Sequence, residues 1–174
     1  WNIGIAFPDL EALNGEIWDQ VSETNLRGPY LLARAFATML KSNEAGRIGH
    51  IVNIASAAGI APGGSSIAYA ASKAALSRLV RVMAVELAQD NILVNAVAPG
   101  TVDTPMIASA LAKPGKTYKP SGRSPLGRVA EPADVVAVIR FLLQPASNYV
   151  TGTWIPVDGG TSAAFVASGA PTGG

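Results

Sequence analysis

Apolar runs with the composition of buried strands alternate along this chain with long stretches of helical periodicity, and this alternation constrains the fold more than any other feature. The six segments follow one another in the order 16–40 (helix), 48–56 (strand), 68–89 (helix), 92–100 (strand), 131–144 (helix) and 153–160 (strand). The pair Gly28–Pro29 predicts an irregularity inside the first helix. Continuous apolar runs rich in β-branched residues are typical of parallel strands covered on both faces. Their alternation with helices predicts an α/β fold with a doubly wound parallel sheet.

The remaining segments have the composition of loops and chain ends. Residues 1–6 have the pattern of a strand end followed by a turn. The prolines, glycines and lysines of 101–130 indicate a mobile loop with a short helix around 105–111. The low-complexity stretch 161–174 indicates a flexible tail. We therefore expect one domain over residues 1–160, followed by that tail.

Composition excludes several classes of function. The 174 residues carry a net charge of +1, which gives no attraction to nucleic acid or to an anionic membrane. The absence of cysteine excludes disulfides and thiol nucleophiles, and one histidine with 12 scattered carboxylates argues against a metal site. No apolar run approaches the roughly 20 residues of a membrane span, and no secretory signal opens the chain. We therefore expect a cytoplasmic protein without metal, membrane or nucleic-acid partners.

Three chemically active side chains occur in an otherwise small-residue stretch. Ser56 ends the strand 48–56, and Tyr69 and Lys73 follow it, four residues apart, at the start of the next helix. Side chains four apart share a helix face, so the ammonium would lower the pKa of the phenol from its usual value of about 10. Such a phenol can exchange a proton with a carbonyl or alcohol oxygen that the serine also binds. Because no side chain carries hydride, oxidoreduction there would require a cofactor.

The same residues also have a simpler structural explanation. Tyr-x-x-x-Lys on a helix is common and usually describes a packed ring beside a solvated charge. A serine at the end of a buried strand favours catalysis, but the spacing alone leaves both interpretations open. His50, the single histidine, lies near the start of the strand and away from the carboxyl end where ligands bind, so we expect no catalytic role for it.

Longer motifs extend this pattern along the chain. They are, in order, NLRG (25–28), NIAS (53–56), YAASK (69–73), NAVAPGTVDTPM (95–106), LGRVAEPADVVAVIRFL (126–142) and VTGTWIPVDGG (150–160). From Asn2 to about Gly160 the sequence resembles the short-chain dehydrogenase/reductase family in its common shorter form. The resemblance implies a Rossmann-like sheet and exchange of hydride between a nicotinamide cofactor, NAD or NADP, and a small carbonyl or alcohol substrate.

The resemblance also implies a role for each matching catalytic residue. Tyr69 would be the general acid/base, and Lys73 would lower its pKa and hydrogen-bond the nicotinamide ribose. Ser56 would orient the substrate oxygen. Asn25 would anchor a water that links Lys73 to solvent as a proton relay. Taken alone, Asn25 is a residue that caps a backbone break where a helix bends.

A second set of residues would contact the cofactor. The Pro99–Gly100 turn and the backbone of Val102 would contact the nicotinamide, and the Thr104 hydroxyl would hold its carboxamide. Taken alone, these residues are a turn and a helix N-cap. Asn2 and Gly4 match a family segment near the adenine ring, although Trp1 and Ile3 depart from it.

The family's first glycine-rich turn, which cradles the pyrophosphate at a helix N-terminus, has no counterpart in this sequence. The glycines of 61–66 follow the serine strand and have the wrong spacing. The segment that would choose between NAD and NADP is also absent. The sequence therefore corresponds to a partial sheet, strands four to seven of the family with their helices, and we expect this fragment to bind a dinucleotide weakly or not at all.

Two interpretations of the whole chain stay open. It is either the catalytic part of an oxidoreductase or a non-catalytic half-domain that acts only through oligomerisation or partner docking. Uncovered strand edges and helix faces fit the hydrophobic content of 49% and the charged content of 14%. The helices 16–40 and 68–89 resemble those through which family members form dimers and tetramers, or they only cover the sheet. The basic residues of 113–123 indicate a solvated loop or a lid that prefers acidic substrates.

Overall fold

A parallel sheet lies between two helical layers in this computed structural model, which describes residues 13–41, 46–60, 66–105 and 124–164. Its strands are β1 (Gly49–Ile54), β2 (Ile92–Pro99) and β3 (Trp154–Val157), paired in the order β1-β2-β3. Gly49 lies opposite Ile92, and Ala96 lies opposite Trp154. The predicted parallel α/β sheet is therefore confirmed, with a last strand shorter than the apolar run 153–160.

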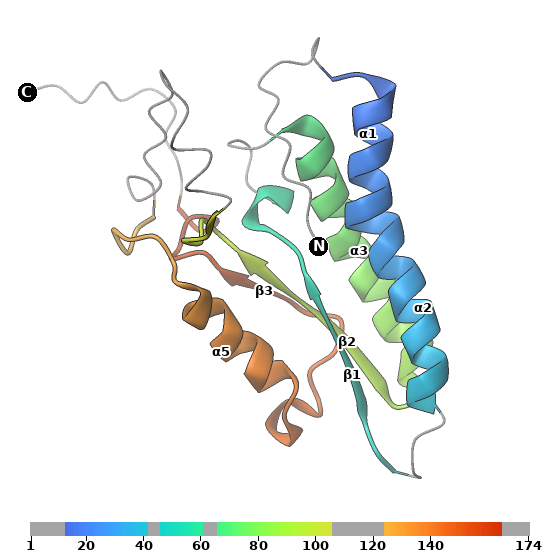
Figure 1. Cartoon of the computed structure of the whole chain (residues 1–174). Coiled ribbons are helices and arrows are strands. Elements are labelled where there is room, and N and C mark those ends of the chain that lie inside the picture. The colour runs from blue at the N-terminus through green and yellow to red at the C-terminus, as the bar shows by residue number, and fades with distance from the viewer. Residues whose placement is uncertain (1–12, 42–45, 61–65, 106–123, 165–174) are drawn as a thin grey trace, which may run out of the picture.

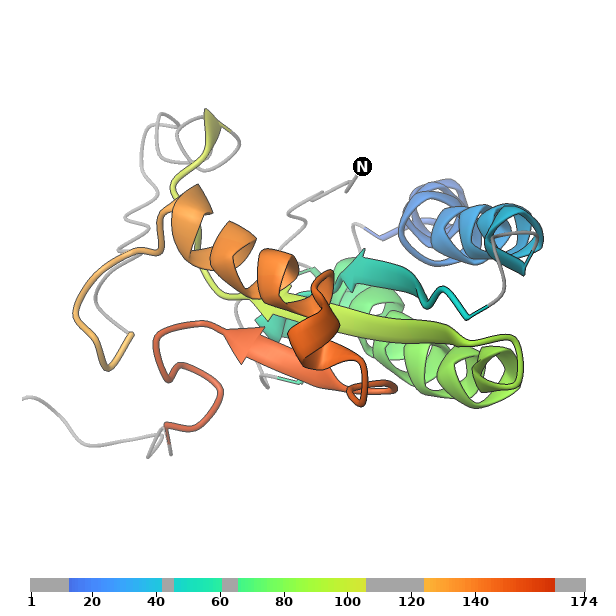
Figure 2. The ribbon, with the colours of Figure 1, turned by 90° about the horizontal axis from the view of Figure 1, so that it is seen from below.

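The helices cover both faces of this sheet. One face carries α1 (Gly15–Ser22), α2 (Gly28–Lys41) and α3 (Ile67–Ala88), and the other carries α5 (Pro132–Leu142) (Figure 1, Figure 2). The start of each helix is encoded locally. Asn14 and Ser66 accept hydrogen bonds from the first turns of α1 and α3. The side chain of Asp134 accepts from the backbone N–H of Glu131 over 2.8 Å at the start of α5.

A π-helical turn interrupts the helix predicted over 16–40. Residues Glu23–Arg27 join α1 to α2, and the N–H of Gly28 donates to the carbonyl of Glu23, five residues back. Pro29 has no N–H, and its ring crowds the preceding turn, so the irregularity falls just before the Gly28–Pro29 pair at which the sequence predicts it. The turn carries Asn25, which is fully buried.

Alternate side chains of β2 enter two separate cores, as the period of two in a strand requires. The first core joins one face of β2 to α2 and α3, and its fully buried strand residues are Ile92, Val94, Ala96 and Ala98. The second core joins the other face to α5 through Val97, Val135 and Leu142. Burial of both faces explains why the segment 92–100 is almost continuously apolar.

A buried amide fastens β3 to the central strand. Asn95 is 1% exposed. Its Nδ2 donates to the carbonyl of Val150 over 2.7 Å, and its Oδ1 accepts from the N–H of Thr153 over 3.1 Å. These bonds add to the backbone bonds that Gly152 and Thr153 make with β2 just before β3 begins, so the start of β3 is held against the middle of β2.

Several predicted features lie outside the described residues. They are Asn2 and Gly4, the strand end at 1–6, all but the first residue of the helix around 105–111, the whole basic segment 113–123, and the tail beyond residue 164. Residues 161–164 form turns at the end of β3, where the Thr161 hydroxyl donates to the carbonyl of Asp158 over 2.8 Å. Among the helices that the structure describes, none is long and apolar enough to cross a membrane.

Candidate active site

The carboxyl end of β1 and the first turns of α3 bring Ser56, Tyr69 and Lys73 together. Ser56 follows β1 by two residues and caps the 3₁₀ turn Ala57–Gly59, where its Oγ accepts from the N–H of Ala58 over 3.2 Å. The hydroxyl of Ser56 also hydrogen-bonds the side chain of Tyr69. The two hydroxyl groups therefore form one unit at the edge of the sheet where ligands bind in parallel α/β folds.

Lys73 is buried beneath this hydroxyl pair. The residue is 1% exposed, and its Nζ donates to the carbonyl of Ile54 over 3.0 Å. The same Nζ lies 5.6 Å from the centre of the Tyr69 ring. Burial lowers the pKa of Lys73 to about 8. At neutral pH the side chain still carries its positive charge. It lies beside Tyr69, as the four-residue spacing of the two residues predicts.

The pKa of Tyr69 is raised, which differs from the lowering that the Tyr–Lys spacing predicts. Burial of the phenol is the largest cause, because it disfavours the phenolate. The hydrogen bond from Ser56 acts in the opposite direction and stabilises the phenolate. In this structure the serine hydroxyl, rather than the ammonium of Lys73, is the group that offsets the effect of burial.

Gly59 allows the serine turn to lie against α3. A Cβ atom at this position would lie 2.9 Å from the backbone carbon of Lys73 and 3.0 Å from the backbone nitrogen of Ala74. Both atoms belong to helix backbone, which cannot move aside as a flexible side chain can. The absence of a side chain at residue 59 therefore brings Ser56 within reach of Tyr69, a requirement that the sequence analysis does not identify.

Asn25 approaches the site from the π-helical turn. Its side chain is fully buried, and its Nδ2 donates to the Oγ of Ser72 over 3.3 Å. Ser72 is the neighbour of Lys73 in the chain, so the structure brings Asn25 to the same turn of α3 as the lysine. Single π turns inside helices occur frequently at functional sites, where they direct a side chain that a regular helix would turn away.

The second predicted set lies beyond the carboxyl end of β2. The N–H of Gly100 donates to the carbonyl of Val157 over 3.0 Å, and Val102 pairs with Ala130 in an isolated parallel bridge. A Cβ atom on Gly100 would lie 2.9 Å from the Cα of Asp158. Pro99, Gly100 and Val102 therefore form a backbone platform beside β3. Thr104 follows it and is half-buried.

Asp158 organises the loop against which this platform rests. Its two carboxylate oxygens accept from the N–H of Gly160 over 2.9 Å and from the N–H of Ser162 over 2.8 Å. Burial raises the pKa of Asp158, but the hydrogen bonds from Ser162 and Gly160 together outweigh it and hold the pKa below its usual value. The charged carboxylate thus fixes the turn that follows β3, and the sequence analysis does not single it out.

Two groups of residues are therefore brought together, one by β1 and α3 and one by β2 and β3. The first can bind and protonate an oxygen atom, and the second offers backbone groups and the Thr104 hydroxyl. The predicted residues Asn2 and Gly4 are not described by the structure. His50 is the second residue of β1, at the end of the strand opposite to Ser56. Within the described ranges, no group of three or more His, Asp or Glu side chains could hold a metal ion.

Comparison with known proteins identifies relatives along most of the chain. Residues 1–162 match the family described as enoyl-(acyl carrier protein) reductase. A tropinone reductase homolog of Arabidopsis thaliana is 40% identical over 161 residues, which cover 91% of this chain and 60% of that protein. The 3-oxoacyl-[acyl-carrier-protein] reductase of Thermotoga maritima is 41% identical over 152 residues, with 87% and 59% covered. The chain thus spans about 60% of the length of these curated relatives.

Solved structures agree with this assignment. The 3-ketoacyl-(acyl-carrier-protein) reductase from Brucella melitensis, solved in complex with NADH, superposes with a TM-score of 0.84 at 30% identity over 93% of this chain and 64% of that chain. The family match, the relatives and the fold agree with the motifs around Ser56, Tyr69 and Lys73. The chain therefore belongs to the short-chain dehydrogenase/reductase family.

Proposed function

We propose that this chain carries the acid/base site of an NAD(P)-dependent oxidoreductase that interconverts a carbonyl group and an alcohol. The observation that carries the proposal is the hydrogen bond between the side chains of Ser56 and Tyr69, with the Lys73 ammonium one helical turn away. Two hydroxyl groups that bond each other can both approach one further oxygen atom. This arrangement suits a carbonyl that must be polarised and then protonated.

Tyr69 would exchange the proton. In the reducing direction its hydroxyl gives a proton to the carbonyl oxygen, and in the oxidising direction its phenolate takes the proton of the alcohol. Ser56 stabilises that phenolate by donating to it, and the nearby positive charge of Lys73 favours the same form. Asn25, held against α3 by Ser72, would anchor the water that returns protons from solvent by way of Lys73.

The described residues fit a nicotinamide cofactor. Lys73 would hold the ribose hydroxyls, the backbone of Pro99, Gly100 and Val102 would contact the nicotinamide, and Thr104 would hold its carboxamide. When bound, the nicotinamide supplies or accepts the hydride that no side chain can carry. The structural likeness to a reductase complexed with NADH supports this assignment. Asn2 and Gly4 would contact the adenine part, and these residue types do not distinguish NAD from NADP.

Substitution of Tyr69 tests the proposal. We expect Tyr69→Phe to reduce turnover of ketones with NADH or NADPH by about 10²–10⁴-fold, the usual contribution of a general acid/base, without loss of thermal stability. Tyr149→Phe is the matched control, because Tyr149 is fully exposed and lies far along the chain. Turnover that survives in the Tyr69→Phe protein would remove Tyr69 from its assigned role. The substrate is found by assaying a panel of ketones, since the named relatives differ in substrate.

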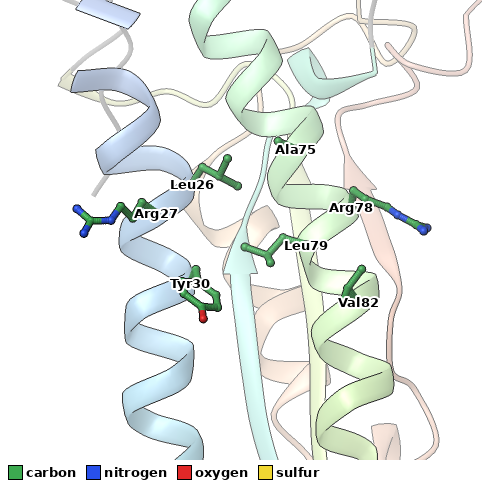
Figure 3. Close-up of a pocket in the computed structure, with 7 residues that line it drawn as sticks. All are labelled: Leu26, Arg27, Tyr30, Ala75, Arg78, Leu79 and Val82. Carbon is green, nitrogen blue, oxygen red and sulfur yellow. The ribbon is translucent and has the colours of Figure 1, made fainter. Parts of the chain in front are cut away.

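The outer faces of α1, α2 and α3 support self-association of the chain. A groove of about 430 Å³ lies between residues 26–30 and the helix α3. In Figure 3, Leu26 and Leu79 point toward each other within this groove, and Arg27 and Arg78 point away from it. Large side chains are exposed in and beside it, with exposed fractions of 42% at Tyr30 and 45% at Val82, which line the groove, and 77% at Val85 next to Val82. An apolar face of this extent usually marks an interface.

The charges on α3 favour a second copy of the chain as the occupant. Val82 lies in this groove, Arg78 lies four residues before it and Glu86 four residues after it, and all three are exposed. If two α3 helices cross in antiparallel orientation at Val82, each Arg78 meets the partner's Glu86. Such a self-complementary pattern suits a two-fold interface. We therefore propose a homo-oligomer built through the long helices.

A non-catalytic half-domain is the second candidate, supported by the same exposed apolar faces. Cofactor binding separates the two candidates. Saturable quenching of NADH fluorescence by the 174-residue chain, together with ketone reduction, supports the oxidoreductase. A stable oligomer that binds neither NADH nor NADPH supports the half-domain. A cytoplasmic location stays a prediction from the sequence.

A further inference from the structure

Ser72 lies on the buried side of α3 between Tyr69 and Lys73, and the roles assigned above do not include it. The residue is 4% exposed. Its hydroxyl donates to the backbone carbonyl of Tyr69 over 2.7 Å and accepts from the Nδ2 of Asn25 over 3.3 Å. A hydroxyl has one donor and two acceptor sites, so one side chain can satisfy both partners. Ser72 thereby links the π-helical turn to the first turns of α3.

We propose that Ser72 is a positioning residue of the acid/base site: it holds Asn25 beside Lys73 and fixes the helical turn that separates Tyr69 from Lys73. The inference rests on the proposed function of Tyr69 and extends the site by one residue. Ser72 itself does not touch the reacting oxygen in this scheme. It acts through the side chain of Asn25 and through the backbone of Tyr69.

The geometry of α3 explains why this hydroxyl matters. In an α-helix the carbonyl of Tyr69 accepts from the N–H of Lys73, four residues later. The hydroxyl of Ser72 adds a second donor to the same carbonyl, and such bonds adjust the direction of a helix locally. Tyr69 reaches the Ser56 hydroxyl from this turn, so a small change in the turn weakens the hydrogen bond that stabilises the Tyr69 phenolate.

The bond to Asn25 adds a tertiary constraint. Asn25 and Ser72 are 47 residues apart in the chain, and both are buried. The π turn lacks the regular hydrogen bonds of α1 and α2 on either side of it, so a partner outside the turn helps to fix the direction of its side chain. Without the Ser72 hydroxyl, the buried amide of Asn25 loses this acceptor, and a buried donor that loses an acceptor tends to reorient.

Ser77 provides a matched control on the same helix. Its hydroxyl donates to the carbonyl of Lys73 over 3.0 Å, so it makes the same kind of back-bond to helix backbone. It lies one turn beyond Lys73 and away from the end of α3 that carries Tyr69. Loss of the Ser77 hydroxyl therefore tests the general effect of removing a helix back-bond.

Titration of the Tyr69 phenol gives a readout that does not depend on activity. The chain contains four tyrosines, so the ultraviolet absorbance of the Tyr69 phenolate is obtained as the difference between a protein and its Tyr69→Phe counterpart. We expect Ser72→Ala to shift the Tyr69 transition upward by about half a pH unit or more, because a looser first turn of α3 weakens the Ser56 hydrogen bond that stabilises the phenolate. Ser77→Ala and the hydroxyl-preserving Ser72→Thr should leave it unchanged. If Ser72→Ala does not fold, Ser72→Cys, with its weaker hydrogen bonds, should give a shift in the same direction.

Turnover supplies the second readout. We expect Ser72→Ala to lower kcat and to move its pH profile in the same direction as the titration, with little change in KM for the ketone. Asn25→Ala combined with Ser72→Ala should lower kcat by less than the product of the two single effects, because the two variants share the Asn25–Ser72 hydrogen bond. A purely structural role predicts lower thermal stability with the titration and the pH profile unchanged, and that result overturns the inference. Turnover that survives Tyr69→Phe overturns the proposed function instead, whatever Ser72 does.

Discussion

The Nζ atom of Lys73 lies 3.0 Å from the carbonyl oxygen of Ile54, so a buried ammonium on α3 is tied to the last residue of β1. The carbonyl holds the charge at a fixed point beneath Ser56 and Tyr69. It supplies only a neutral partner, however, and burial therefore dominates the pKa of Lys73 and lowers it to about 8.

The lowered pKa of Lys73 makes stability depend on pH in a defined window. Between about 8 in the folded protein and 10.5 in the unfolded chain, only the unfolded chain holds this proton. Raising the pH through that window therefore favours the folded state. We expect the free energy of unfolding in urea to increase from pH 8 to pH 10, by no more than roughly 3 kcal/mol. This increase should be missing in Lys73→Met. A wild-type protein whose free energy of unfolding does not rise from pH 8 to pH 10 would contradict the prediction.

Gly59→Ala should destabilise the protein by about 1–3 kcal/mol, the usual effect of forcing an extra carbon into a packed site. The added Cβ would lie within 3.1 Å of three backbone atoms of α3. Gly15→Ala is the control, because nothing lies within 4 Å of a Cβ at that helical position. Alanine there should be neutral or stabilising by up to about 1 kcal/mol. Thermal unfolding measures the stability of both variants. Equal transition temperatures for Gly59→Ala and Gly15→Ala would show that the turn after Ser56 packs less closely against α3 than described.

Asp158→Asn should destabilise the turn after β3. The asparagine side chain has one acceptor oxygen in place of two, so one of the N–H groups of Gly160 and Ser162 loses its partner. We expect a loss of about 1–2 kcal/mol at neutral pH. Because the pKa of Asp158 is lowered in the folded state, its contribution is present above the unfolded value of about 4 and is lost as the pH falls below it. The free energies of unfolding of the variant and the wild type should therefore become similar at acid pH.

Asp19→Asn controls for a general effect of carboxylate loss. Asp19 is exposed on α1. Exposed charges contribute little to stability. Acid unfolding curves of the three proteins give the comparison, and an equal effect of the two substitutions would contradict a special role for Asp158.

Arg78→Glu should weaken self-association, because it would place two glutamates opposite each other at each end of the proposed helix crossing. We expect the dissociation constant to rise about tenfold or more, as measured by analytical ultracentrifugation. The double variant Arg78→Glu with Glu86→Arg should restore association by exchanging the charges. Arg140→Glu, an exposed position on α5 at the opposite face, is the control. Failure of the double variant to restore association would rule out this register.

The periodicity of the sequence predicts the described helices and strands to within a few residues. The signal is strong because β2 is buried on both faces and the helices carry clear caps at Asn14 and Ser66. The π turn is predicted only as an irregularity at Gly28–Pro29. A proline distorts the helical turn that precedes it. The sequence therefore indicates Pro29 as the cause of the irregularity, and the structure shows that the π turn lies at Glu23–Arg27.

The site is less predictable from the sequence. The proximity of Ser56, Tyr69 and Lys73 follows from the strand end and the four-residue spacing. The raised pKa of Tyr69 does not, because burial depends on how the whole chain packs. Gly59, Ser72 and Asp158 matter through contacts made only in the folded molecule, and the sequence shows them as a small residue in a loop, a polar residue in a helix and an acid near a turn.

Asn95 constrains the path of the chain that leads into the last strand of the sheet. An ordinary strand edge accepts any segment that offers matching backbone groups. Beside β2, an incoming strand must also present a carbonyl like that of Val150 and an N–H like that of Thr153 to a buried amide. Both groups belong to the backbone, so a segment of another sequence supplies them as well, provided that its chain follows the same path. A segment that approached β2 along a different path would leave this amide unpaired in an apolar interior. One side chain thus selects the path of the incoming chain rather than its residue types.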